Sequence, residues 1–537
     1  MYRIQHRGIN GFFPLRVTSI RRSVQSFSGK TSLASNQGDP QLDFRAFIDT
    51  LREDGDLADV HQEVDPNLEI GAIVRRVSET HAKAPFFHNV KNARNGLWKI
   101  FGNAASLRKD DEFKYGRIAR SLGLPPNSSW KAILEKTQSA KNRSPLAPNV
   151  LSTGPCKQNK IFGDDIDLTT LPVPLLHQAD AGKYLQTYGV HVLKTPDGSW
   201  TNWSIFRGMV HDKRRLVCLV VPGQHSSMLR EQWVKEGKDE VPWALALGVP
   251  PAAAIAAALP LPAGISEGEY VGMLAGKPLD MVKCELSDLL VPSNSEIVIE
   301  GTFSLKDEAS EGPFEDYIGL HVDGETSMQP LFTVNAITYR DNAILPVSVP
   351  GRITDESAIQ HTTASMASEE LLELLRGHGF PIKDACASFE TMATWCALQV
   401  DIRELALMKT TPNELCMRIG EIAFSSKATM LMNRLLLIGD DVDVHRWGDV
   451  LWAYTTRCRP GQDEYVFENV KGLPLTPYMK YGRGNPLKGG KMVSNCLFPM
   501  EYRGERNFRS VDFRSSYPRE LQKKVKAGWT RMGFDAI

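Results

Sequence analysis

The sequence predicts a mixed α/β (α+β) protein with three folded regions, and three observations support this. The chain has 537 residues, and at roughly 100–200 residues per domain such a length implies about two to four domains. Strand-like apolar runs dominate between residues 160 and 350, and helix and strand patterns mix on either side. We therefore expect an N-terminal α/β region over 39–150, a β-barrel-like domain with helical insertions over 151–352, and a C-terminal α/β domain over 353–537.

Composition and charge exclude several classes of protein. Hydrophobic residues make up 42% of the chain and charged residues 23%, which is ordinary for a folded protein and excludes wholesale disorder. Lys and Arg together number 63, as do Asp and Glu, so the formal net charge is zero. A neutral chain lacks the broad electrostatic footprint of a protein that binds nucleic acid or an anionic membrane surface.

Residues 1–38 differ from the rest of the chain because they contain no Asp or Glu. They include five arginines, one lysine and six serines, and acidic residues begin abruptly at Asp39. An acid-poor, Arg-rich and Ser-rich N-terminus is typical of a mitochondrial transit segment. The alternative is a disordered tail without a targeting role, in a cytoplasmic protein.

The N-terminal α/β region should begin with an amphipathic helix. Four apolar residues occupy positions i, i+3, i+4 and i+7, the spacing of one buried helix face: Phe44, Phe47, Ile48 and Leu51. The apolar run at 98–101 is typical of a short strand. Residues 145–155 contain three prolines and are expected to form a linker to the central domain.

The central domain is expected to consist mainly of strands. Aromatic and β-branched residues gather in four runs of strand length, at 188–193, 203–210, 216–221 and 296–303. Two further runs, 332–339 and 343–349, flank residues 340–342 and predict a hairpin.

The longest apolar stretch of the chain, residues 245–265, contains four prolines. Two proline clusters leave only the alanine-rich piece 252–259 as a plausible helix, so we interpret the stretch as a buried loop–helix–loop and not as a membrane span.

The C-terminal domain should alternate helices and strands around a partly parallel sheet. Ser368 is placed to cap a helix with Glu369 and Glu370 in its first turn, and Gly377 is placed to end it. Residues 435–438 predict a buried strand that ends in a loop.

Eight cysteines are scattered along the chain without a C-x-x-C pair. This spacing does not favour a disulfide scaffold, a zinc finger or an iron–sulfur cluster, and it predicts reduced, mostly buried thiols in an intracellular protein. The glycine-rich stretch 481–491 could cradle a phosphate, although it is neither a Walker A loop nor a G-x-G-x-x-G turn. Asp440, Asp441 and Asp443 could ligate a cation, with solvated loop carboxylates as the alternative.

Four short segments of the central domain carry more information together than apart. They are TNWSIFR at 201–207, PGQH at 222–225, LPAGISE at 261–267 and EGPFED at 311–316. In this order they resemble the UbiD-type decarboxylases that use prenylated flavin mononucleotide (prenylated FMN), above all the fungal ferulic acid (phenylacrylic acid) decarboxylases. The resemblance covers the chain from about residue 40 to its end. It implies that the central domain is a split β-barrel that binds the flavin.

The resemblance implies that Asn202, His225 and Glu267 hold a manganese ion that bridges to the flavin phosphate. An amide oxygen, an imidazole and a carboxylate suit a hard divalent ion that keeps positions open for phosphate and water. On a regular strand Asn202 and Arg207 face opposite sides, so a bulge or turn must lie between them if both are to reach one ligand.

Further cofactor contacts follow from the same resemblance. Gln224 is expected beside the flavin ring, and Lys427 is expected to reach the cofactor from the C-terminal domain, which would place the active site between two domains. The implied cofactor-binding residues are Asn202, Trp203, Ser204, Ile205, Phe206, Arg207, Gln224, His225, Glu267 and Lys427. A potassium ion near the phosphate is implied as well, held by Trp203, Ala256, Ala257, Leu259, Glu267 and Arg457. Ala257 and Ala258 stand where the fungal relatives carry serines, and Leu259 stands where they carry methionine.

Arg207, Glu311 and Asp316 match the family's catalytic arginine and two carboxylates, with Asp316 as the proton donor. The nearest fungal relatives have glutamate at the last position.

Four neighbouring positions also depart from the fungal pattern. Glu315 replaces a glycine and Phe206 replaces a small residue, while Met430 and Leu473 stand where aromatic residues surround the substrate. The acyl pocket is therefore expected to differ.

The implied activity is the non-oxidative, reversible decarboxylation of an α,β-unsaturated aromatic acid of ferulic or cinnamic type to the vinyl product and CO₂, through a covalent prenylated-FMN adduct. The alternatives are a decarboxylase of an aromatic ring acid of the ubiquinone-precursor type, and a paralogue that binds flavin without turnover. The resemblance also implies a homodimer formed through the C-terminal domain and a flavin prenyltransferase that supplies the cofactor.

Overall fold

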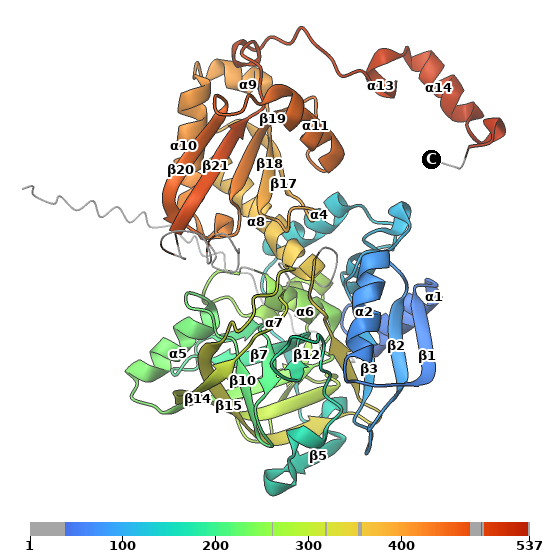
Figure 1. Cartoon of the computed structure of the whole chain (residues 1–537), viewed down its shortest axis with the longest axis vertical. Coiled ribbons are helices and arrows are strands. Elements are labelled where there is room, and N and C mark those ends of the chain that lie inside the picture. Colours follow the sequence, from blue (N-terminus) through green and yellow to red (C-terminus); the bar gives the residue numbers. More distant parts are fainter. Residues whose placement is uncertain are drawn as a thin grey trace, which may run out of the picture. The chain divides into compact units, whose positions relative to one another are not determined.

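The computed structural model describes residues 38–259, 261–316, 319–352, 357–472, 479, 485 and 488–534, with only the backbone for 357–366. The predicted transit segment, 1–38, therefore lies outside the described residues except for Gly38. The described residues belong to one compact unit, Asn36–Ile537. They form sheets of four, nine, three and five strands together with the surrounding helices (Figure 1).

The N-terminal region contains the four-stranded sheet, whose order is β1-β2-β3-β16. Helix α1 (Phe44–Glu53) is capped by Asp43, whose carboxylate accepts the N–H groups of Arg45 and Ala46. The four apolar residues predicted on its inner face are all buried, so the predicted helix is confirmed. The other elements of this region are β1 (Leu57–Val64), α2 (Glu69–Thr80), β2 (Ala84–Val90), β3 (Lys99–Gly102), α3 (Gly116–Ser121) and α4 (Trp130–Lys141).

The fourth strand of this sheet comes from far along the chain. β16 (Ile344–Val347) pairs in parallel with β3, so the hairpin predicted across residues 340–342 is wrong. The chain turns away at this point because the buried carboxylate of Glu296 gathers Arg340, Arg45 and the backbone N–H of Ile344. These bonds tie the N-terminal sheet to the central domain.

The central domain is a nine-stranded sheet that curls on itself. Its order is β6-β9-β10-β15-β14-β11-β7-β8, with β5 paired to β15. β8 (Thr201–Ser204) and β9 (Gly208–Val210) stand near opposite ends of this order, yet only residues 205–207 separate them. Because a chain extends at most about 3.6 Å per residue, the two ends lie within about 14 Å of each other. The predicted barrel-like domain is confirmed.

The remaining strands of this sheet show where the sequence prediction was too simple. The run 203–210, predicted as one strand, is interrupted between β8 and β9. The predicted linker at 145–155 contains β4 (Asn149–Leu151), which belongs to a three-stranded sheet with β12 (Asp280–Lys283) and β13 (Leu290–Pro292). The other central strands are β5 (Asn159–Phe162), β6 (Tyr184–Gln186), β7 (Gly189–Lys194), β10 (Arg215–Cys218), β11 (Glu240–Leu247), β14 (Ile297–Glu311) and β15 (Ser327–Tyr339).

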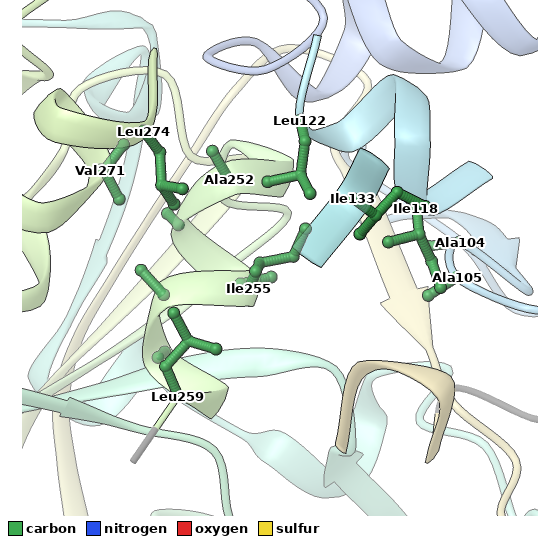
Figure 2. Packing of buried hydrophobic residues seen from close by; sticks show 14 of the residues in the cluster. Ala104, Ala105, Ile118, Leu122, Ile133, Ala252, Ile255, Leu259, Val271 and Leu274 are labelled. Carbon is green, nitrogen blue, oxygen red and sulfur yellow. The ribbon is translucent and has the colours of Figure 1, made fainter. Parts of the chain in front are cut away.

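Three helices are inserted among the central strands: α5 (His225–Lys235), α6 (Pro251–Ala258) and α7 (Glu267–Ala275). The alanine-rich α6 is buried, as predicted, because its small side chains allow close approach of its neighbours. Figure 2 shows Ala252 and Ile255 of α6 in one apolar cluster with Ile133 of α4 and Leu274 of α7. Among the described helices, none is long and apolar enough to cross a bilayer.

The C-terminal domain is built on the five-stranded sheet, in the order β17-β18-β19-β21-β20 (Figure 1). The pairs β18–β19 and β19–β21 are parallel and the other two are antiparallel, so the predicted partly parallel sheet is confirmed. The elements are α8 (Ser357–Gly377), β17 (Ile382–Ala387), β18 (Trp395–Val400), α9 (Ile402–Leu407), α10 (Pro412–Ser425), β19 (Arg434–Gly439), α11 (Trp447–Arg457), β20 (Glu464–Lys471) and β21 (Lys488–Asn495), followed by α13 (Phe513–Ser516) and α14 (Arg519–Gly528).

The start of helix α8 corrects another prediction. The helix ends at Gly377 as expected, but it begins at Ser357, so Ser368 lies in its interior and not at its N-cap. Ser368 is fully buried, and its hydroxyl accepts the backbone N–H of Ala387 on β17 at 2.9 Å. The residue therefore joins helix to sheet, a tertiary role that its local sequence does not reveal.

Candidate active site

The interruption between β8 and β9 shapes the site. Residues 205–207 form no strand, and they separate Asn202 on β8 from Arg207 at the end of the break. The irregularity predicted between these two residues is confirmed. It frees Arg207 from the strict alternation of side chains that a continuous strand would impose.

Asn202 and His225 are in contact. Asn202 is 1% exposed, and its Oδ1 atom lies 3.0 Å from Nδ1 of His225, the first residue of α5. The amide nitrogen of Asn202 donates to Ser204 Oγ at 2.7 Å, which leaves the amide oxygen facing the imidazole. Burial, and then the charge of Lys427, lower the pKa of His225. The ring is therefore neutral at pH 7, as a metal ligand must be.

Glu267 completes this first centre from α7, of which it is the first residue. Its carboxylate accepts the backbone N–H of Trp203 at 2.8 Å, directly beside Asn202 in the chain. Glu267 is 2% exposed, and burial raises its pKa to about 8. No cation among the described residues offsets that burial. At neutral pH the carboxyl group therefore keeps its proton in the protein alone.

The amide of Asn202, the imidazole of His225 and the carboxyl of Glu267 fit a divalent ion. Ligand atoms around a small ion with bonds of about 2.1 Å stand roughly 3 Å apart, and the separation of Asn202 Oδ1 from His225 Nδ1 is 3.0 Å. Among the described residues no three His, Cys, Asp or Glu side chains gather as a metal site. The set depends on the amide of Asn202 as its third ligand.

Arg207, Glu311 and Asp316 form a second centre. Nε and Nη2 of Arg207 donate to the two oxygens of Glu311 at 2.8 and 2.9 Å, and Nη1 contacts Asp316. Glu311 is 1% exposed, and it also accepts the hydroxyl of Tyr184 at 2.8 Å. Burial alone would lower the pKa of Arg207, but the bonds to Glu311 and the charge of Asp316 outweigh it and raise that pKa.

Aromatic and backbone contacts hold the second centre in place. The guanidinium of Arg207 lies over the ring of Phe314, 4.7 Å from its centroid, and the Phe314 ring is 4.3 Å from that of Tyr184. The backbone N–H of Glu315 donates to Asp180 at 3.0 Å, which anchors the loop that carries Asp316. Burial, and then the charge of Glu311, raise the pKa of Tyr184, so its hydroxyl keeps the proton that it donates.

Lys427 approaches the first centre from the C-terminal domain. It begins the short 3₁₀ helix Lys427–Thr429, and its charge contributes to the lowered pKa of His225. The buried Lys491 supports this turn, because its Nζ donates to the carbonyls of Thr429 and Met430 at 2.7 and 3.2 Å. Lys427 thus lies within electrostatic range of His225, and its predicted contact with the cofactor stays a prediction.

The other residues predicted around the flavin and the substrate lie as follows. Gln224 is exposed at the N-cap of α5 and makes no side-chain cap bond. The ring of Phe206 stacks on His191 with centroids 3.6 Å apart, so one face of it packs in the barrel and not in an acyl pocket. Ile205 packs against the core cluster around α6. Leu473 lies outside the described residues.

The residues predicted to bind potassium are brought together only in part. Trp203 and Glu267 are hydrogen-bonded, and Ala256, Ala257 and Leu259 are buried at α6. Arg457, in contrast, binds Asp441 at 2.7 and 3.1 Å within the C-terminal domain.

The two weaker sequence hypotheses gain no support. Asp441 is neutralised by Arg457, and Asp440 pairs with Arg506 at 2.8 Å, so these carboxylates serve as ion-pair partners. Most of the glycine-rich stretch 481–491 lies outside the described residues. A cavity of about 370 Å³ in the C-terminal domain is lined by Trp395, Asn433, Arg434, Val466, Gly490, Lys491 and Met492. It includes the last two residues of the glycine-rich stretch but none of the residues predicted to bind the flavin or a metal.

Two residues that contribute to the second centre were not predicted from the sequence. Tyr184 shares the Glu311 carboxylate with Arg207, although 127 residues separate it from Glu311. His191 binds the backbone of Phe206, inside the break. Both lie in ordinary strand sequence with no local motif, so only the pairing of distant strands reveals them.

Comparison with known proteins shows that the chain is similar to carboxy-lyases. Residues 48–137, 149–353 and 361–496 match the N-terminal, Rift-related and C-terminal domains of 3-octaprenyl-4-hydroxybenzoate carboxy-lyase. The chain therefore belongs to the UbiD family, and the resemblance seen in the four sequence segments is confirmed.

Individual relatives cover nearly the whole chain. It is 43% identical to ferulic acid decarboxylase 1 of Saccharomyces cerevisiae, over 92% of this chain and 99% of that protein. It is 42% identical to pyrrole-2-carboxylic acid decarboxylase of Pseudomonas aeruginosa, over 92% and 98%. A solved UbiD-class enzyme of Pelotomaculum thermopropionicum, an evolved dimeric form in complex with prenylated FMN, matches with a TM-score of 0.71 and 25% identity, over 88% and 96%. The chain is thus a decarboxylase with the fold of enzymes that bind prenylated FMN.

Proposed function

We propose that this decarboxylase converts an α,β-unsaturated aromatic acid of ferulic or cinnamic type to the vinyl product and CO₂, in a non-oxidative and reversible reaction. The observation that carries the proposal is the second centre, where one half-buried arginine holds two carboxylates of unequal exposure. The side chain of Glu311 is fully buried, whereas that of Asp316 is 23% exposed. The similarity to ferulic acid decarboxylase 1 supports the substrate class.

The unequal exposure assigns the roles of the three residues. Glu311 accepts hydrogen bonds from Nε and Nη2 of Arg207 and from the hydroxyl of Tyr184. It therefore orients the guanidinium and does not face the substrate. Arg207 can offer its remaining N–H groups to a substrate carboxylate. Asp316, the accessible acid, donates the proton to the carbon that loses CO₂.

We propose prenylated FMN as the cofactor, with Mn²⁺ between the protein and its phosphate. When bound, the flavin accepts the electron pair left by CO₂. Asn202, His225 and Glu267 would hold the metal, and its charge would compensate the phosphate and the ionised Glu267. The N-terminus of α5 lacks a side-chain cap, so its free N–H groups favour an anion at the same place. A flavin prenyltransferase would supply the cofactor.

Further residues are proposed to contact the flavin and a potassium ion. Lys427 would reach the flavin from the C-terminal domain, and Trp203, Ser204, Ile205, Phe206 and Gln224 would line it. Potassium would bind beside Trp203 and Glu267, mainly through backbone carbonyls.

A second candidate substrate is an aromatic ring acid. The observation that favours it is the near-equal similarity to pyrrole-2-carboxylic acid decarboxylase, 42% against 43% for the ferulic acid enzyme. Turnover of a ubiquinone-type precursor belongs to the same alternative.

One experiment separates these possibilities. The protein is expressed with and without a flavin prenyltransferase, its absorption spectrum is recorded, and CO₂ release is measured with cinnamic, ferulic, pyrrole-2-carboxylic and hydroxybenzoic acids. The proposal predicts that unsaturated acids are turned over only by the flavin-loaded protein. Preference for a ring acid would support the second candidate, and a loaded protein that releases no CO₂ would be a non-catalytic paralogue.

We also propose a homodimer. After residue 509 the chain forms α13 and α14, which bury no residue, and it exposes apolar side chains. They are Val511, Phe513, Tyr517, Leu521, Met532 and Phe534. A second copy of the C-terminal domain would cover them. Light scattering should then give the mass of a dimer for the full chain and the mass of a monomer for a chain that ends at residue 509.

We propose mitochondrial import directed by residues 1–38, on the basis of their acid-free, Arg-rich composition. Purified organelles should contain a mature protein without roughly the first 20–40 residues. A mature N-terminus at Met1, or a purely cytosolic protein, would contradict this.

A further inference from the structure

His191 is a buried residue that the reaction does not use directly. We propose that it is a positioning residue, which holds the break at 205–207 in the shape that directs Arg207 to Glu311 and Asp316. This inference rests on the proposed function of Arg207. His191 lies on β7 opposite Ser204, the last residue of β8, and is fully buried.

The hydrogen bonds of His191 leave only one arrangement of its proton. The indole N–H of Trp243, on β11, donates to Nδ1 of His191 at 2.9 Å. An indole nitrogen can only donate, so Nδ1 carries no proton and Nε2 must carry it. Nε2 lies 2.9 Å from the carbonyl of Phe206 and donates to it. Burial lowers the pKa of His191 to about 3, so this arrangement persists across the working pH range.

The imidazole also holds the side chain of Phe206. The two rings are nearly parallel, with centroids 3.6 Å apart and an angle of 3° between their planes. One histidine therefore fixes both the carbonyl and the ring of the residue before Arg207.

Both peptide units around Arg207 are anchored. The unit before it is held by His191 through the Phe206 carbonyl, and the carbonyl of Arg207 itself accepts the backbone N–H of Leu219 at 3.2 Å. Two fixed peptide units define the position and direction of the Arg207 side chain. Because a shift of about 1 Å in a catalytic group can cost roughly 10²-fold in rate, loss of one anchor should lower turnover while the cofactor stays bound.

Three variants test this in the flavin-loaded protein. His191→Phe keeps a flat ring against Phe206 but removes both nitrogens. His191→Gln keeps an N–H donor in reach of the carbonyl. Ile337→Ala is the matched control, because Ile337 is buried in the same barrel core on β15 but touches neither the break nor Arg207 in the described contacts.

We expect all three variants to retain prenylated FMN. His191→Phe should lose about 10- to 100-fold in kcat with little change in KM. The limb of its pH–rate profile at high pH, where the proton donor Asp316 loses its proton, should move because Arg207 no longer contacts Asp316 as before. His191→Gln should recover most of kcat. Ile337→Ala should be less stable but should keep the wild-type kcat and pH profile.

A crystal structure of cofactor-free His191→Phe gives a readout that does not depend on activity. The Phe206 carbonyl should rotate, and the Arg207 guanidinium should leave its two-pronged contact with Glu311. The inference would be overturned if Arg207 does not move in this structure, or if His191→Phe keeps the wild-type kcat and pH profile. It would also be overturned if Ile337→Ala loses as much kcat as His191→Phe. If the wild type released CO₂ from no acid, the proposed function would fail, and the crystal structure would still decide whether His191 positions Arg207.

Discussion

The two centres of the site handle charge in opposite ways. At the second centre, the guanidinium of Arg207 supplies the counter-charge of the buried Glu311 and also contacts Asp316, and the hydroxyl of Tyr184 donates to Glu311. At the first centre, Asn202 and a neutral His225 accompany Glu267, whose pKa is raised to about 8 by burial. A buried carboxylate without a cation is unstable and keeps its proton. Glu311 therefore has its counter-charge in the chain, whereas Glu267 has none among the described residues, which is the difference expected if a bound cation completes the first centre.

This difference separates two tasks. The first centre should govern how much cofactor the protein holds, because the proposed metal would link its side chains to the flavin phosphate. The second centre should govern turnover of the cofactor that is bound. Variants in the two centres should therefore fail in different ways.

The largest effect is expected for Arg207→Met. Turnover should fall by about 10³-fold, because the group that orients the substrate carboxylate is lost. The free energy of unfolding should fall by about 3–5 kcal/mol, since Glu311 is left as an unpaired buried charge. CO₂ release and urea unfolding measure the two effects. The double variant Arg207→Met/Glu311→Leu should regain stability without regaining turnover. If the single variant unfolds like the wild type, Arg207 is not the counter-charge that stabilises the buried Glu311.

Asp316→Asn should have the next largest effect. It keeps the size of the side chain but removes the acid, so turnover should fall by about 10²-fold while fold and cofactor content persist. Asp316→Glu should remain active with an altered preference among acids, because its carboxyl reaches one methylene farther. Glu315→Gln, on the same loop, is the control and should stay near the wild-type rate. Normal turnover and solvent-deuterium incorporation in Asp316→Asn would remove Asp316 from the proton-donor role.

The pH dependence of metal binding tests the first centre. The pKa of Glu267 is raised from 4.5 to about 8, so within this window the folded protein holds a proton that the unfolded chain has lost. The metal-free protein should therefore lose stability as pH rises through the window. If manganese binds through the Glu267 carboxylate as proposed, it displaces that proton, so its affinity should increase with pH by up to about tenfold per unit, with release of nearly one proton at pH 7.

Calorimetry in buffers of different ionisation enthalpy measures the released proton. Glu267→Gln is the matched variant and should show weaker binding with no proton release. Proton-free manganese binding by the wild type would mean that Glu267 is already ionised or is not a ligand.

Tyr184→Phe should give the smallest effect. It removes one neutral donor from Glu311, which costs about 1 kcal/mol of stability, while the two bonds from Arg207 remain. Turnover should change only a few-fold. A loss as large as that of Arg207→Met would show that Tyr184 takes part in the reaction itself.

The parts of the fold that could be predicted from sequence are those with local causes. The face of α1 follows from its apolar spacing, and the break before Arg207 follows from strand alternation applied to two residues that must reach one ligand. The four segments of the central domain were enough to indicate the family.

The errors arose where distant segments compete with local patterns. The turn at 340–342 has hairpin chemistry, yet β16 pairs with β3 because Glu296 draws the chain toward Arg45. Ser368 is a good N-cap residue, but the helix passes through it and β17 uses its hydroxyl. The role of His191 depends on Trp243 and Phe206 meeting around it, which no sequence window contains.

The most direct test of the separation between the two centres is turnover per bound cofactor in two isosteric variants. Glu267→Gln and Glu311→Gln are expressed with a flavin prenyltransferase, and manganese, prenylated FMN and CO₂ release are measured on the same preparations. Glu267→Gln should lose metal and cofactor in proportion to activity, with turnover per bound flavin near that of the wild type. Glu311→Gln should stay loaded and lose turnover. A fully loaded Glu267→Gln, or a Glu311→Gln protein that loses its cofactor, would contradict the account.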